Sequence, residues 1–105
     1  MELVVEVYRT TKSFPVDEKF GLTSQLQRAV VSVAANIAEA QGRFGEREFV
    51  NFLSIAHGSL RETETHIQIA FRLGYITNDQ QDTLLDHASS VGRLINGLAN
   101  SLRTP

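Results

Sequence analysis

The sequence predicts an all-α fold: an antiparallel, up-down-up-down four-helix bundle with a short first helix, in one domain over residues 1–105. Apolar residues recur at helical spacings of three and four along most of the chain. The two prolines are Pro15 and Pro105, so only glycines and turn residues interrupt helix between Leu22 and Arg103. The connecting segments are short, which makes neighbouring helices antiparallel.

The first helix is expected at residues 2–13. Its apolar face repeats at helical spacing and consists of Val4, Val7, Tyr8 and Thr11. Pro15 ends this helix, because the residue before a proline is disfavoured in helical conformation. A connector follows at residues 14–21, and we expect Phe14 and Phe20 to anchor it on the bundle.

The second helix is expected at residues 22–42, and it is apolar around most of its circumference. Its core face consists of Leu26, Ala29, Val30, Val33, Ile37 and Ala40. Four more apolar residues widen that face: Val31, Ala34, Ala35 and Ala38. The polar residues form one narrow stripe of Gln25, Arg28, Ser32, Asn36, Glu39 and Arg43. Such a helix packs on more than one neighbour.

The third helix is expected at residues 46–74, after a turn that contains Gly42 and Gly45. Its core stripe consists of Phe49, Phe52, Leu53, Ala56, Leu60, Thr63, Ile67, Ala70 and Phe71. A second, partial stripe beside it consists of Ile55, Glu62, His66, Ile69 and Leu73. Gly58 in mid-helix costs about 1 kcal/mol relative to alanine, so we expect it to allow close contact with another helix. Gly74 is suited to the C-terminal cap.

The fourth helix is expected at residues 78–103. Thr77 and Gln80 have the spacing of a capping box at its start. A heptad-like seam follows, made of Leu84, Ala88, Val91, Ile95, Leu98 and Leu102.

Composition limits the function classes. The net charge is −2, and the eight arginines and two lysines are scattered among acids, whereas a dedicated DNA-binding domain is usually strongly basic. The chain has no cysteine, which excludes disulfides and thiolate sites and fits a cytoplasmic protein. No apolar run approaches the ~20 residues of a membrane span. The acidic start does not resemble a signal peptide.

No constellation of residues specifies a reaction. Glu39, Glu62 and His66 are the candidate metal ligands, but the Glu-x-x-His pairs of di-iron bundles are absent. Serines and histidines near one another on a helix do not make a nucleophile–base pair. The stretch GRFGER precedes a helix N-terminus, yet it matches no nucleotide-binding motif. We therefore expect no catalytic residues, no metal, no cofactor and no small-molecule substrate.

Self-association is the interpretation that the residues favour. The core of one small bundle cannot bury both the wide apolar surface of the second helix and the extra stripe of the third. Closed homo-oligomers commonly bury such patches. The candidate interface residues are Val31, Ala35, Ile55, Ile69 and Leu73. The candidate structural polar contacts, within or between subunits, are Arg28, Asn36, Glu39 and Glu62.

The stretch from Tyr8 to Ile76 also resembles a known bacterial family. The resemblance is carried by Phe14-Pro15 with Glu18, GLTSQ at 21–25, Arg28-Ala29, Ser32, Asn36-Ile37-Ala38-Glu39, Phe52-Leu53, Ala56, Gly58-Ser59 and Glu62. These motifs are similar to the four-helix-bundle proteins first known from open reading frames inside intervening sequences of 23S rRNA genes. The accessory protein of diversity-generating retroelements is a more distant relative. Ala40 stands where the family usually has glycine, so this helix is expected to continue to Gly42.

The resemblance implies a four-helix bundle, often a ring-shaped homopentamer, and no established enzyme activity. We therefore expect a non-enzymatic, self-associating scaffold or interaction protein of the bacterial cytoplasm. The alternative is an RNA- or DNA-binding module that acts as an oligomer. Its candidate nucleic-acid contacts are Arg28, Arg43, Arg47 and Arg61.

Overall fold

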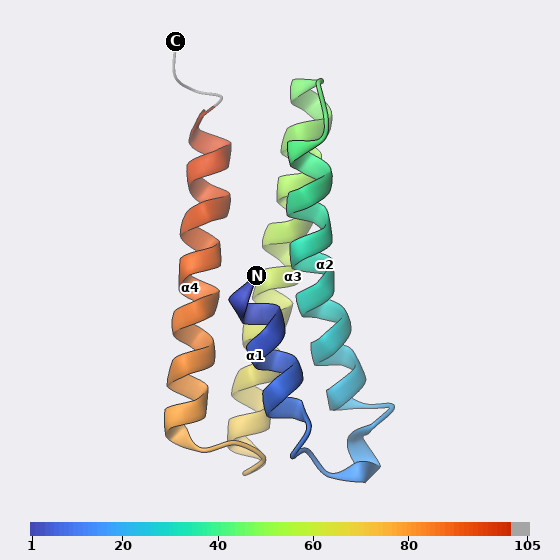
Figure 1. Cartoon of the computed structure of the whole chain (residues 1–105), viewed down its shortest axis with the longest axis vertical. Helices are drawn as coiled ribbons and strands as arrows, with labels where there is room; N and C mark the ends of the chain where they lie inside the picture. Colours follow the sequence, from blue (N-terminus) through green and yellow to red (C-terminus); the bar gives the residue numbers. More distant parts are fainter. Residues whose placement is uncertain (102–105) are drawn as a thin grey trace.

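The computed structural model describes residues 1–101 and is built from helices (Figure 1). Its elements are α1 (Glu2–Thr11), the short 3-10 helix η1 (Val16–Glu18), α2 (Leu22–Gln41), α3 (Glu46–Arg72) and α4 (Asn78–Asn100). The predicted all-α four-helix bundle is confirmed. The first three predicted helices extended one or two residues too far at their C-terminal ends. The predicted roles of Leu102 and Arg103 lie outside the described residues.

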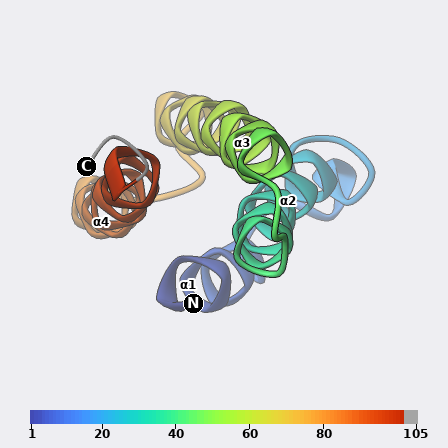
Figure 2. The ribbon, with the colours of Figure 1, turned by 90° about the horizontal axis from the view of Figure 1, so that it is seen from above.

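The four helices surround one core, with α3 between α2 and α4 (Figure 2). Helix α1 closes the bundle on the opposite side, where it packs against α2 and α4. It has only 10 residues, whereas α2, α3 and α4 have 20, 27 and 23. Its N-terminus therefore lies about halfway along the bundle (Figure 1).

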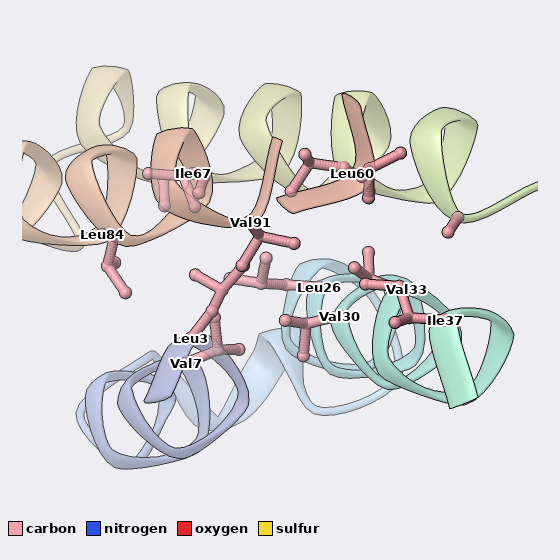
Figure 3. Close-up of a cluster of buried hydrophobic side chains, with 14 of the residues drawn as sticks. Leu3, Val7, Leu26, Val30, Val33, Ile37, Leu60, Ile67, Leu84 and Val91 are labelled. Atoms are coloured by element: carbon pink, nitrogen blue, oxygen red, sulfur yellow. The ribbon is translucent and has the colours of Figure 1, made fainter. Parts of the chain in front are cut away.

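The core is mainly aliphatic and draws side chains from all four helices (Figure 3). All six predicted core residues of α2 are buried, as are Leu84, Ala88, Val91 and Ile95 of α4. In α1 the buried face is Leu3, Val7 and Thr11, whereas Val4 is half-buried and Tyr8 is 42% exposed. The predicted face of α1 was therefore rotated by about one residue. The cause is that α1 packs against two helices at once, which centres its buried face between them.

The connector between α1 and α2 is anchored by a carboxylate. Phe14 is buried, with its ring centroid 5.5 Å from that of Tyr75, but Phe20 is 89% exposed, so the prediction that Phe20 anchors this segment was wrong. Glu18 accepts hydrogen bonds from the Leu22 N–H at 3.1 Å and from the Tyr75 hydroxyl at 2.8 Å. A methyl group on Gly21 would lie 2.7 Å from Glu18 Oε1, which explains the glycine.

These hydrogen bonds change the acidity of both side chains. The Leu22 N–H first, and the Tyr75 hydroxyl second, lower the pKa of Glu18 from its usual 4.5. The hydrogen bond that the Tyr75 hydroxyl donates to Glu18 raises the pKa of Tyr75 above its usual 10.0. The contact therefore favours the ionised carboxylate and the neutral phenol.

The start of α4 and the end of α3 have the local structures that the sequence predicts. Thr77 and Gln80 form the predicted capping box of α4. Gly74 has a φ of +80° and ends α3, where the Tyr75 N–H donates to the Ala70 carbonyl at 2.9 Å. Both the cap and the glycine stop were therefore readable from local sequence.

Gly58 differs from expectation. It is exposed on α3, and a methyl group placed on it would meet no atom of residues 1–101 within 4 Å. The expected close contact with another helix is therefore wrong within this chain.

Within residues 1–101, none of the helices combines the length and the apolar character needed to cross a membrane.

Candidate functional site

The polar stripe of α2 runs along its boundary with α3. The hydroxyl oxygens of Ser32 and Ser59 lie 2.8 Å apart across this boundary. The Asn36 amide donates to the carbonyl of Ser32 at 2.8 Å and to its hydroxyl at 3.1 Å. Thr63 donates to the carbonyl of Ser59 at 2.8 Å. The Ser32–Ser59 contact joins the two helices, and the Asn36 and Thr63 hydrogen bonds each lie within one helix.

Next to these serines, α2 and α3 form a shallow polar groove with a volume of about 370 Å³. Its polar lining consists of Gln25, Arg28, Ser32, Ser59 and Glu62. Arg28 and Glu62 line the same groove, but no ion pair joins them within residues 1–101. Exposed ion pairs add little to stability in any case, so the fold of one chain does not depend on these two charges.

Behind Glu62 lies a histidine that is mostly buried. Nε2 of His66 is 3.5 Å from Glu62 Oε1, and the side chain of His66 is 12% exposed. Neither ring nitrogen has a hydrogen-bond partner among the described residues. Across residues 1–101, no three His, Asp or Glu side chains come together as a metal-binding group would require.

An apolar surface lies on the outer side of α2 and α3. Val31 is 43% exposed, Ile55 is 44% exposed, and Ala35, one turn after Val31, is also exposed. The Ser32–Ser59 contact fixes the antiparallel pairing of the helices, which places Ala35 and Ile55 at the same level. We call Val31, Ala35 and Ile55 the apolar band.

The other two candidate interface residues lie farther along α3. Ile69 is 41% exposed and Leu73 is 54% exposed. With a rise of 1.5 Å per residue, they lie roughly 21 and 27 Å from Ile55 along the helix axis. The structure therefore brings together three of the five predicted interface residues, and it leaves Ile69 and Leu73 near the other end of the bundle.

Glu39 and Arg43 are engaged with their own chain. Arg43 donates to Glu39 at 2.6 Å and lies 3.9 Å from a carboxylate oxygen of Glu48. Its guanidinium also lies 5.0 Å from the ring centroid of Phe52. Arg43 is thus fixed against the start of α3, and its charge is compensated.

The four candidate nucleic-acid contacts do not form one patch. Arg28 lies in the groove between α2 and α3, and Arg47 lies in the first turn of α3. Arg61 pairs with Glu64 at 2.6 Å and lines a groove with Leu85 of α4, on the opposite side of α3. With Arg43 already paired, the described residues present no continuous basic surface through these positions.

Two contacts could not be found from the sequence. The pairing of Ser32 with Ser59 depends on the register of two helices, which no local pattern reports. The bridge from Glu18 to Tyr75 spans 57 positions of the chain. No pattern within a few positions of either residue indicates this bridge.

The chain is similar to proteins already known. The family model described as 23S rRNA-intervening sequence protein matches residues 1–97. A solved structure with a similar fold is a protein of unknown function from the S23 ribosomal protein family of Bacteroides thetaiotaomicron. Its TM-score is 0.85 and its sequence identity 26%, and the match covers 93% of this chain and 92% of that one. No curated protein matches.

Proposed function

We propose that this chain, which belongs to the 23S rRNA-intervening sequence protein family, is a non-enzymatic scaffold that assembles with copies of itself in the bacterial cytoplasm. The proposed assembly is a closed ring, with five copies as the expected number. Its partner is a second copy of the chain, joined through the outer surface of α2 and α3.

The observation that carries this proposal is the apolar band. Val31 and Ile55 each expose more than two-fifths of their surface, and exposed Ala35, one turn after Val31, lies at the level of Ile55. Gly58, one turn from Ile55, has open space where a side chain would be. A mid-helix glycine costs about 1 kcal/mol, and close approach of another subunit would offset that cost.

The polar groups beside the band support a contact surface rather than a reaction centre. Ser32 is hydrogen-bonded to both Ser59 and Asn36. Arg28 and Glu62, at the edge, carry opposite charges that can meet complementary charges on another copy. Paired charges of this kind set the orientation of an interface more than its strength.

The test is the molar mass of three proteins by size-exclusion chromatography with light scattering. Ile55→Asp places a charge in the apolar band, and we expect it to give monomers with unchanged helix content by circular dichroism. Val5→Asp is the matched control, because Val5 is 45% exposed on α1, away from the band. It should assemble like the unmodified chain. A monomeric unmodified chain at tens of micromolar overturns the proposal.

The alternative is an RNA- or DNA-binding oligomer. The family description and the S23 ribosomal protein family of the similar structure motivate it. The pairing of Arg43 and Arg61 with acids weighs against it. Fluorescence anisotropy with a structured RNA distinguishes the two, because phosphate contacts by several arginines give an affinity that falls steeply with salt. We expect no saturable binding at near-physiological salt.

A further inference from the structure

A second surface lies on the other side of α3, facing α4. A shallow groove of about 230 Å³ separates these helices, with a mostly apolar lining. Its lining includes Val50, Ser54, His57, Ile95, Asn96 and Ala99. We call it the α3–α4 groove. Val50 at its edge is 48% exposed, so the groove continues into an apolar surface.

The apolar band and the α3–α4 groove lie at the same level of the bundle. Ile55 of the band follows Ser54 of the groove directly in sequence and precedes His57 by two residues. The two surfaces are separated around α3 and not along it, since α3 lies between α2 and α4 (Figure 2). A rotation about an axis parallel to α3 would carry one surface to the other without a shift along the axis. Contacts related in this way close into rings, whereas shifted contacts form open filaments.

An exposed glycine lies beside the apolar band. Gly58 lies one turn from Ile55 of the band, whereas Gly97 directly follows Asn96 in α4 and is not part of the groove lining. Each is exposed within a helix, and a methyl group on either would meet nothing in residues 1–101 within 4 Å. Gly92 differs, because there a methyl group would lie 3.5 Å from Leu60. The fold of one chain therefore explains Gly92 and leaves Gly58 and Gly97 unexplained.

The edge of the band carries both Arg28 and Glu62, and Glu62 has an opposite charge at the edge of the groove. Glu62 lies one turn after Gly58, at the edge of the band, with a side chain that is 59% exposed. Arg93 lies one turn before Asn96 and Arg47 one turn before Val50, at the edges of the groove. Neither arginine forms an ion pair within residues 1–101. The contact of Gly92 with Leu60 places Arg93 near the level of Glu62.

We propose that the apolar band of one copy packs into the α3–α4 groove of the next copy, with Ile55 entering the groove and Glu62 facing Arg93. This inference rests on the proposed self-association and names the two surfaces that meet. In this arrangement the contact is head-to-tail, because each copy uses its band toward one neighbour and its groove toward the other. The successive copies then form a closed ring.

Disulfide trapping tests the pairing, because the chain contains no cysteine. Three single variants are prepared: Ile55→Cys in the band, Asn96→Cys in the groove, and Thr83→Cys as a control on the α1 side of α4. Each is first shown by light scattering to assemble like the unmodified chain. Equimolar pairs are then mixed, allowed to exchange subunits, and oxidised. A disulfide requires the two Cα atoms within about 7 Å, so it reports direct contact.

We expect the Ile55→Cys and Asn96→Cys mixture to give a covalent dimer that contains one copy of each, by mass spectrometry after proteolysis. The mixture of Ile55→Cys with Thr83→Cys should give none. Efficient dimerisation of Ile55→Cys alone would mean that band packs on band, which overturns the inference. Ala99→Cys provides a second position in the groove. If the protein assembles but Ile55→Cys cross-links to neither Asn96→Cys nor Ala99→Cys, the inference is overturned while the proposed function stands.

A charge exchange gives a second, independent readout. Glu62→Arg and Arg93→Glu should each lower the fraction of assembled protein, and the double variant should recover most of it. Recovery is expected only if the two side chains face each other between copies, since no ion pair joins them within residues 1–101 of one chain. Losses that add in the double variant contradict the pairing. If the unmodified chain is monomeric, the proposed function itself has failed.

Discussion

Gly58 is the residue whose identity the single chain does not explain. It is exposed in mid-helix, and no atom of residues 1–101 lies within 4 Å of the place a methyl group would take. We predict that Gly58→Ala raises the free energy of unfolding of the monomer by about 0.5–1 kcal/mol, because alanine loses less backbone entropy in a helix. Urea unfolding in the Ile55→Asp background measures this. The same change should weaken assembly of the otherwise unmodified chain; an equal or stronger assembly would show that the glycine has no role in the contact.

Glu18 gives a prediction about pH. Its pKa is lowered in the folded chain, chiefly by the Leu22 N–H and then by Tyr75. A lowered pKa contributes stability that is fully present above the usual value of 4.5 and is lost as the pH falls through the lowered value. We therefore expect the free energy of unfolding to decrease as the pH falls below 4.5. In Glu18→Gln this decrease should be less steep.

Tyr75 provides the control for that measurement. Its pKa is raised by Glu18, so the stability that it contributes is present below pH 10.0 and is lost above it. Tyr75→Phe should remove this alkaline loss and keep part of the acid dependence, since the Leu22 N–H still donates to Glu18. Urea unfolding across the pH range checks both variants. If the free energy of unfolding of Glu18→Gln decreases with falling pH as steeply as that of the unmodified chain, the proposed role of Glu18 is contradicted.

Between elements, α2 and α3 are joined by a polar contact as well as by the core. The hydroxyls of Ser32 and Ser59 lie 2.8 Å apart. We predict that Ser32→Ala and Ser59→Ala each lower the free energy of unfolding by about 0.5–1.5 kcal/mol, the usual range for one hydrogen bond. The double variant should lose less than the sum, because both changes remove the same contact. Strictly additive losses, measured by urea unfolding of the Ile55→Asp protein, would show that the hydroxyls are not coupled.

The helices themselves could be predicted because their signals are local. The core face of α2, the capping box at Thr77 and the glycine stop at Gly74 each depend on residues within a few positions of one another. The face of α1 was misplaced because Tyr8 and Leu3 are distinguished only by where α2 and α4 lie. Contacts between elements, such as Ser32 with Ser59, require the relative register of helices, and the sequence does not contain it in local form.

In the candidate site, too, features of single helices could be predicted from the sequence and features shared by two helices could not. The exposure of Val31 agrees with the wide apolar face of the second helix, and that of Ile55, Ile69 and Leu73 with the partial stripe of the third; both are properties of single helices. That Ala35 and Ile55 lie at the same level follows from the pairing of α2 with α3. The α3–α4 groove was not expected, because its lining comes from two helices whose polar and apolar residues alternate there.

Over the whole molecule, the bundle carries surfaces of unequal character. The side of α2 and α3 carries the apolar band, and the side of α3 and α4 carries the groove, with Arg47 and Arg93 at its edges. A molecule with two different complementary surfaces at one level is suited to a ring. The net charge of −2 per chain does not oppose such closure strongly at physiological salt, where charges beyond about 8 Å are screened.

Assembly into a closed ring is measured by native mass spectrometry of the unmodified protein at micromolar concentration. We predict one dominant species with a mass that is a fixed multiple of the 11.7 kDa chain, with five as the expected multiple. This multiple should not grow as concentration rises, because a ring closes. A spectrum dominated by the single-chain mass would contradict self-association, and a ladder of ever larger masses would contradict closure.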